Sequence, residues 1–241
     1  MKKVLGIILV LFVFFFVSSA AAGQFGPAEP MAKQGKFSLG IGYFFDQREW
    51  EPDKEVPFGE GKSRSNQIYL QGSFGLMRNW EIYGRFAAAD LALPDWSTHF
   101  TADYKPSGTL GIKGALFPSI DPEGYISIGP FLQSSLGSNY KDRNIIEKTE
   151  VKTPWDINFG ATIQVKNQGI CFYFGPVVYW QRAKIEVERS SGQHFSATFK
   201  EKSNLGGFMG VKFTLYDNIN IEAEGQYKGE FSGGGSITYS F

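Results

Sequence analysis

Apolar and polar residues alternate along most of this chain. In each alternating segment every second residue is large and apolar, and the residues between are mostly Gly, Ser, Thr, Gln or Asn. Successive side chains of a β-strand point to opposite faces of the sheet, so a period of two predicts strands with one apolar and one small, polar face. The expected strands are 36–45, 67–76, 80–90, 109–117, 125–136, 155–165, 170–180, 205–215, 219–227 and 233–241.

The connections between these segments alternate in length. Short turns are expected at 77–79, 118–124, 167–169 and 217–218, and long polar loops at 46–64, 91–106 and 137–154. The alternation also continues past two strands, at 184–188 and 195–199. Short turns on one rim and long loops on the other are typical of barrels that cross an outer membrane. The sequence therefore predicts an all-β fold, a closed antiparallel up-and-down transmembrane β-barrel of about ten strands, with about eight as the alternative.

The polar face of the strands favours a membrane barrel over a water-soluble one. A soluble barrel would expose Lys and Glu on its outer face, whereas here that face is rich in Gly and Ser and carries few charges of either sign. Large aromatic residues near strand ends match the girdle found at membrane interfaces. They are Trp80, Tyr125, Trp155, Trp180, Tyr227 and Phe241.

The last strand carries a more specific signal. Ile237, Tyr239 and Phe241 share one face, and Phe241 is the last residue of the sequence. This ending resembles the terminal strand of bacterial outer-membrane β-barrels, which the barrel assembly machinery reads as a signal. The resemblance implies a location in the bacterial outer membrane, with its lipids and the assembly machinery as partners.

The amino-terminal segment agrees with export. Lys2 and Lys3 precede an apolar run over 4–17, which small residues follow up to Ala22. This pattern predicts a cleavable signal peptide over 1–22, a periplasmic leader over 23–35 and the barrel over 36–241. An uncleaved membrane anchor is the alternative, although the apolar run is shorter than the roughly 20 residues that a spanning helix needs.

Charge and composition exclude several classes of function. Loss of Lys2 and Lys3 with the signal peptide turns 24 basic and 24 acidic residues into 22 and 24, a net charge of −2. No basic stripe is present, so nucleic acid is not expected as a partner. The single cysteine, Cys171, excludes an intramolecular disulfide. No nucleotide-binding or metal-binding motif is found, and no cofactor or metal is expected.

Charged residues on the polar face are candidates for chemistry in the lumen. In a barrel of this size the interior is narrow enough for side chains to fill, so these charges either pair across the lumen or line a narrow channel whose selectivity they set. The candidates are Glu81, Arg85, Lys113, Asp156, Lys212, Glu222 and Glu224.

Two weaker patterns lie outside the strands expected to cross the membrane. His194 and Ser196, with Glu201 nearby, resemble the His-x-Ser element of lipid A deacylases, outer-membrane barrels with a Ser/His/acid arrangement. Acidic residues over 46–55 either hold Ca²⁺ loosely or form a solvated loop.

The whole mature chain is similar in plan to small outer-membrane barrels of the OmpA, OmpX and OmpW type. That resemblance rests on pattern, and the expected strand number differs from the eight-stranded members. We expect a non-enzymatic membrane scaffold with long extracellular loops that contact external ligands. A narrow porin-like channel for small solutes is the alternative, and a lipid A deacylase-like hydrolase is a more remote one.

Overall fold

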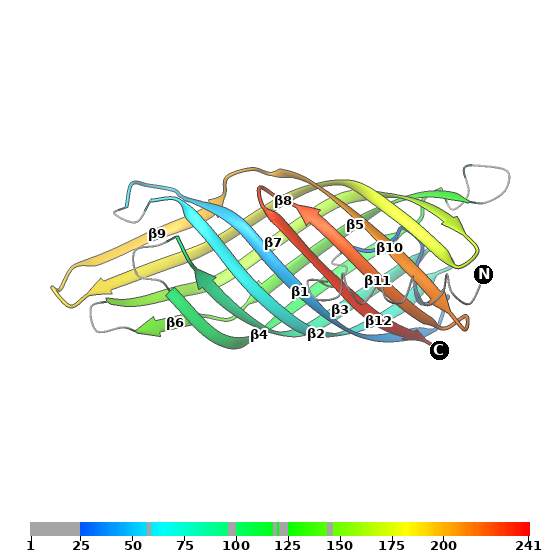
Figure 1. Ribbon diagram of the computed structural model, residues 1–241, viewed down its shortest axis with the longest axis horizontal. Coiled ribbons are helices and arrows are strands. Elements are labelled where there is room, and N and C mark those ends of the chain that lie inside the picture. The colour runs from blue at the N-terminus through cyan, green and yellow to red at the C-terminus, as the bar shows by residue number, and fades with distance from the viewer. Residues whose placement is uncertain (1–24, 57–58, 96–99, 118–119, 121–124, 144–146) are drawn as a thin grey trace, which may run out of the picture.

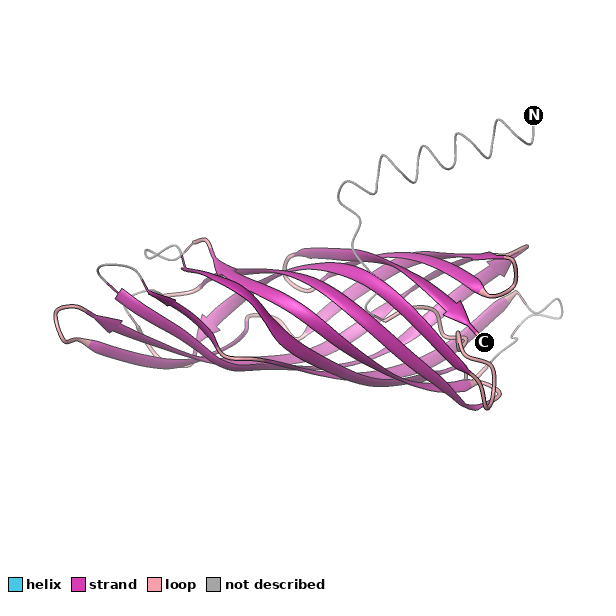
Figure 2. Cartoon of the chain, turned by 90° about the horizontal axis from the view of Figure 1, so that it is seen from below, coloured by secondary structure: helices cyan, strands magenta, loops and turns pink. Residues whose placement is uncertain are grey.

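The computed structural model describes residues 25–56, 59–95, 100–117, 120, 125–143 and 147–241. Every regular element among them is a β-strand (Figure 2). No helix in this part of the chain is long and apolar enough to cross a membrane. The strands are β1 (Phe37–Pro52), β2 (Gly61–Met77), β3 (Trp80–Leu93), β4 (Phe100–Gly114), β5 (Ile126–Gly137), β6 (Tyr140–Arg143), β7 (Glu147–Asn167), β8 (Ile170–Arg189), β9 (His194–Glu201), β10 (Leu205–Leu215), β11 (Ile219–Tyr227) and β12 (Phe231–Ser240).

Ten of these strands form a closed antiparallel ring. The order is β1-β2-β3-β4-β5-β7-β8-β10-β11-β12, and β12 pairs back to β1, from Ser38 opposite Ser240 to Phe45 opposite Gly233. Closure leaves the ring without an unpaired edge, which hydrocarbon would penalise heavily. The predicted antiparallel barrel of ten strands is confirmed.

The barrel is long, and its two ends differ (Figure 1). The short turns and the carboxyl terminus lie at one end, and β6, β9 and the tips of β7 and β8 lie at the other. β7 and β8 contain 21 and 20 residues, about twice the number that a tilted strand needs to cross a bilayer. Beyond the ring, β6 pairs with β7, and β9 pairs with both β8 and the end of β1. We call this part the outer extension.

The outer extension corrects the prediction of long loops. Most of the described residues in 46–64, 91–106 and 137–154 belong to β1 to β4, β6 and β7. In the outer extension the polarity of the wall is reversed, so that outward side chains are polar and inward side chains are apolar. The strands can therefore continue around an apolar core, which includes Trp50, Leu93, Phe100, Ile185 and Phe199. The turn predicted at 118–124 falls almost entirely outside the described residues.

The rest of the wall, which we call the membrane half, has the opposite polarity. Its outward side chains are apolar and exposed, as are Leu39, Leu70 and Leu110. Its inward side chains are polar and buried, among them Gln133, Asn158 and Gln164, each 0% exposed. An apolar outer belt around a polar interior is the arrangement that a bilayer requires of a barrel. Of the predicted girdle residues, Tyr125, Trp180, Tyr227 and Phe241 are exposed, whereas Trp80 and Trp155 are partly buried.

Candidate functional site

Residues 25–32 of the predicted leader lie inside the barrel. Phe25, Ala28 and Ala32 are each 1% exposed, and their segment contacts inward side chains from strands all around the ring. The ring of Phe25 stacks on Phe131 of β5 at 4.4 Å between centroids and meets the edge of Phe208 of β10 at 5.1 Å. The segment expected on the periplasmic side thus fills that end of the lumen. We call residues 25–34 the plug.

Two buried carboxylates hold the backbone of the plug. Glu224 accepts hydrogen bonds from the backbone N–H groups of Phe25 (3.2 Å) and Gly26 (2.8 Å). Glu81 accepts from those of Met31 (2.8 Å) and Ala32 (3.0 Å). Both side chains are at least nine-tenths buried, so water competes little for these hydrogen bonds. These contacts fix both the depth and the direction of the plug.

Wall residues also donate to the carbonyl groups of the plug. Lys113 Nζ donates to the carbonyl of Phe25 at 3.4 Å and pairs with Glu81 at 3.4 Å. Ser240, near the carboxyl terminus, donates to the carbonyl of Met31 at 3.0 Å. Above the plug, Lys228 Nζ lies 4.8 Å from the ring centroid of Phe25. The plug is therefore bound by its backbone at both ends and by one aromatic side chain at its deepest point.

All seven predicted lumen charges face inward. Glu81, Lys113 and Glu224 contact the plug, as described above. Glu222 accepts from Tyr173 at 2.7 Å, and Arg85 donates to Gln71 at 2.6 Å. Arg85 also lies over the rings of Tyr69 and Tyr83, Lys212 is buried in the wall, and Asp156 belongs to a separate cluster further out. The structure thus divides the seven between the plug, the wall and that outer cluster.

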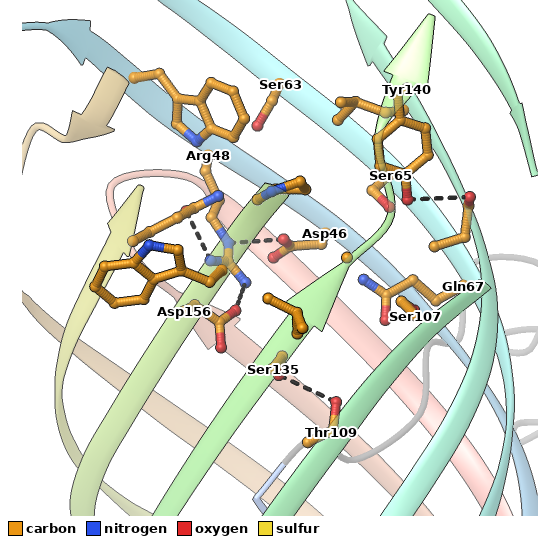
Figure 3. A pocket seen from close by; sticks show the side chains of 18 residues that line it. Asp46, Arg48, Ser63, Ser65, Gln67, Ser107, Thr109, Ser135, Tyr140 and Asp156 are labelled. Atoms are coloured by element: carbon orange, nitrogen blue, oxygen red, sulfur yellow. Dashed lines mark hydrogen bonds and ion pairs between the residues drawn. The ribbon is translucent and has the colours of Figure 1, made fainter. Parts of the chain in front are cut away.

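The outer cluster is centred on Arg48, which sequence reasoning missed (Figure 3). Arg48 pairs with Asp46 at 2.6 Å and Asp156 at 3.0 Å, and it donates to Gln181 at 2.7 Å. Asp46 and Arg48 continue the alternation of β1 beyond Phe45. The period of two could therefore have indicated that both side chains point into the lumen. We call Asp46, Arg48 and Asp156 the ionic trio.

A cavity lies beside the ionic trio. The cavity has a volume of about 80 Å³, which is enough for several water molecules or a small solute. The trio forms one side of the cavity together with Gln181, which accepts a hydrogen bond from Arg48. Serine and threonine hydroxyls and the Gln67 amide complete its polar lining (Figure 3). Trp50 and Tyr140, from the apolar core of the outer extension, line it as well.

The hydrolase-like residues do not form a Ser/His/acid arrangement. In β9, Ala197 and Phe199 face the apolar core, so His194 and Ser196 face outward. Glu201 lies on the opposite face of the strand and accepts from the backbone N–H of Gln181 at 2.7 Å. The acid is therefore separated from the other two groups by the strand itself.

The acidic residues over 46–55 are tied to neighbouring strands. Asp46 belongs to the ionic trio, Glu51 pairs with Lys200 at 3.1 Å, and Asp53 accepts from the backbone N–H of Thr198 at 3.1 Å. No group of three or more metal-ligating side chains is present among the residues that the structure describes.

A valine at Gly75 is expected to dislodge the plug. A Cβ on Gly75 would overlap the backbone carbonyls of Lys33 and Ala32, and overpacking of this kind costs about 1–3 kcal/mol. Labelling by a maleimide of Ala28→Cys, in a Cys171→Ser background, should become about tenfold faster or more. Gly72→Val is the matched control on the same strand, since the nearest atom to its Cβ would be Leu39 Cδ2 at 3.9 Å. Equal labelling rates in the two variants would contradict a plug seated against Gly75.

Comparison with solved structures shows the fold. No family model matches the chain, and no curated protein matches it in sequence. The outer-membrane protease OmpT from Escherichia coli is similar with a TM-score of 0.52 and 12% identity, over 91% of this chain and 99% of that one. The translocator domain of the autotransporter NalP from Neisseria meningitidis matches with a TM-score of 0.47 and 12% identity, over 85% and 88% of the two chains. The likeness to OmpT shows that the chain has the fold of bacterial outer-membrane β-barrels, in agreement with the location predicted from its sequence.

Proposed function

We propose that this protein is a non-enzymatic outer-membrane scaffold with a closed lumen, which holds a rigid β-structure outside the membrane for contact with external ligands. The observation that carries the proposal is the occupied interior. Bilayer lipids surround the apolar belt, and the terminal face of Ile237, Tyr239 and Phe241 serves recognition by the assembly machinery.

Three successive layers support a closed lumen. The plug fills the periplasmic end, and the ionic trio with Gln181 crosses the interior further out. Beyond them, the outer extension packs an apolar core in which Leu93 and Phe199 are each 0% exposed. A path for ions would have to pass all three layers.

The surface of the outer extension suits a contact role. Its outward residues carry charges of both signs at alternating positions, including Lys184, Glu186 and Lys200. Glu186 is held between Lys152 at 2.6 Å and Lys184 at 2.7 Å. Hydrogen bonds from these two lysines lower the pKa of Glu186 to about 2. Its carboxylate therefore stays charged in acid that would protonate an ordinary glutamate.

Planar bilayers test the closed lumen. The full-length protein is expected to give flat current traces in concentrated KCl, because each of the three layers blocks ions. Circular dichroism and heat-modifiable electrophoretic mobility would confirm that the inserted protein is folded. Discrete conductance steps from the intact protein would overturn the scaffold proposal.

A narrow channel is the second candidate, and the polar lining of the membrane half favours it. For this function the plug would have to leave the lumen, and ions would have to pass between the side chains of the two outer layers. A variant lacking residues 25–34 is then expected to conduct while the intact protein does not. Flat traces from both proteins would leave the scaffold as the supported function.

A further inference from the structure

We propose that the cavity beside the ionic trio is a binding site for a small neutral polyol of about the size of glycerol. This inference goes beyond the scaffold function and does not depend on it, since the cavity exists whether or not the barrel conducts.

The charges around the cavity favour a neutral ligand. Arg48 uses its guanidinium on Asp46, Asp156 and Gln181. The remaining carboxylate oxygens are engaged too, because Asp46 accepts from Ser232 at 3.1 Å and Asp156 from Asn158 at 2.9 Å. With two carboxylates and one guanidinium, the trio carries one excess negative charge, which disfavours the binding of anions. A cation would have to compete with Arg48 for carboxylates that are already hydrogen-bonded.

Neutral hydrogen-bonding groups remain available on the other walls. The Gln67 amide and the hydroxyls of Ser63 and Ser107 line the cavity and make no hydrogen bond to another described side chain or backbone group. Trp50, which also lines it, is 3% exposed, and its indole N–H has no acceptor in the described chain. Buried polar groups normally have partners. An amide, hydroxyls and an indole N–H together match the donors and acceptors of a polyol.

The aromatic lining and the volume of the cavity also suit such a ligand. Indole and phenol rings from Trp50, Trp155 and Tyr140 line it together with the polar groups. Small-molecule sites commonly combine aromatic surface with a few convergent polar groups. The cavity volume of about 80 Å³ limits the ligand to a small molecule.

A seam in the wall lies beside the cavity. In the described part of the chain no β-ladder joins the outer half of β4 to β6, and a hydrogen bond from the Thr101 N–H to Asp142 (3.1 Å) spans this seam. The lining includes Gly137 at the end of β5 and Pro154 beside the register shift in β7. The cavity thus adjoins the part of the wall where the ladder is interrupted, on the outer side of the plug.

Titration of the full-length protein in detergent with glycerol, D-xylose and D-glucose tests the proposal, with tryptophan fluorescence as the readout. A saturable change is expected with glycerol, which the cavity can hold, and no saturation with acetate or ammonium. Gln67→Met keeps the length of the side chain and removes its amide, so the Kd should weaken about tenfold, the worth of one good hydrogen bond.

Gln47→Met is the matched control, because Gln47 is on the outward face of β1 and its side chain donates to Glu230 at 3.4 Å, away from the cavity. Its Kd should equal that of the unmodified protein. Ser107→Ala provides a second test if Gln67→Met does not fold. The proposal is overturned if glycerol does not saturate, if the charged probes bind as tightly, or if both folded cavity variants keep the original Kd.

Discussion

Replacement of Arg48 by methionine is expected to lower the free energy of unfolding by about 3–5 kcal/mol, the usual cost of breaking a buried ion pair from one side. Methionine fills much of the same space but leaves Asp46 and Asp156 as buried carboxylates without their cation. The side chains of the trio are at most 10% exposed, so water can compensate little. Urea unfolding in detergent micelles, followed by tryptophan fluorescence, measures the loss.

A triple variant separates the charge from the packing. Adding Asp46→Asn and Asp156→Asn to Arg48→Met removes all three charges with little change of shape, and most of the lost stability should return. If the triple variant is as unstable as Arg48→Met alone, the loss comes from packing around Arg48. If Arg48→Met itself unfolds at the original urea concentration, the ionic trio contributes nothing to the barrel.

Replacement of Phe25 by alanine is expected to cost about 3 kcal/mol, at the lower end of the range for buried aromatic side chains. Phe25 is 1% exposed and packs between Phe131 and Phe208. The loss of stability cannot exceed the free energy with which the plug binds inside the barrel. A barrel that would otherwise keep a void at position 25 can release the plug instead. Limited proteolysis at Lys33, together with urea unfolding, reports both outcomes.

Phe25→Leu is the control for this prediction. Leucine keeps most of the apolar volume and loses the ring stacking, so its cost should stay below about 1.5 kcal/mol. The plug should then remain protected from protease. An alanine variant that unfolds like the original protein and keeps its plug protected would show that the backbone contacts with Glu81 and Glu224 suffice.

The orientation of wall residues was predictable from the chain alone. All seven lumen charges face inward, because alternation along a strand assigns each side chain to one face without reference to any other strand. The same rule explains the error in the outer extension. Its outward residues are polar, so segments such as 46–64 resemble loops, although Trp50 and its neighbours continue the alternation on the inner face.

The candidate site was predictable only in part. Asp156 was identified as a lumen charge, but its partner Arg48 was assigned to a loop. The contact between Phe25 and Glu224 joins residues 199 positions apart. Residues 23–35 have no periodicity that would place them in a strand or a lumen, so nothing in their own sequence shows where they pack.

The strands that cross the membrane, their two faces, the closed barrel and the charges of its interior were predictable from the sequence, because they follow from the local period of two and from the polarity of each face. Three features became known only from the folded protein: the occupied lumen, the position of Arg48 between two carboxylates, and the cavity beside them. Closure of the ring brings strands from opposite parts of the chain face to face across the lumen. Which side chains meet there depends on the strand register and on the path of the plug, and neither is encoded in any single segment.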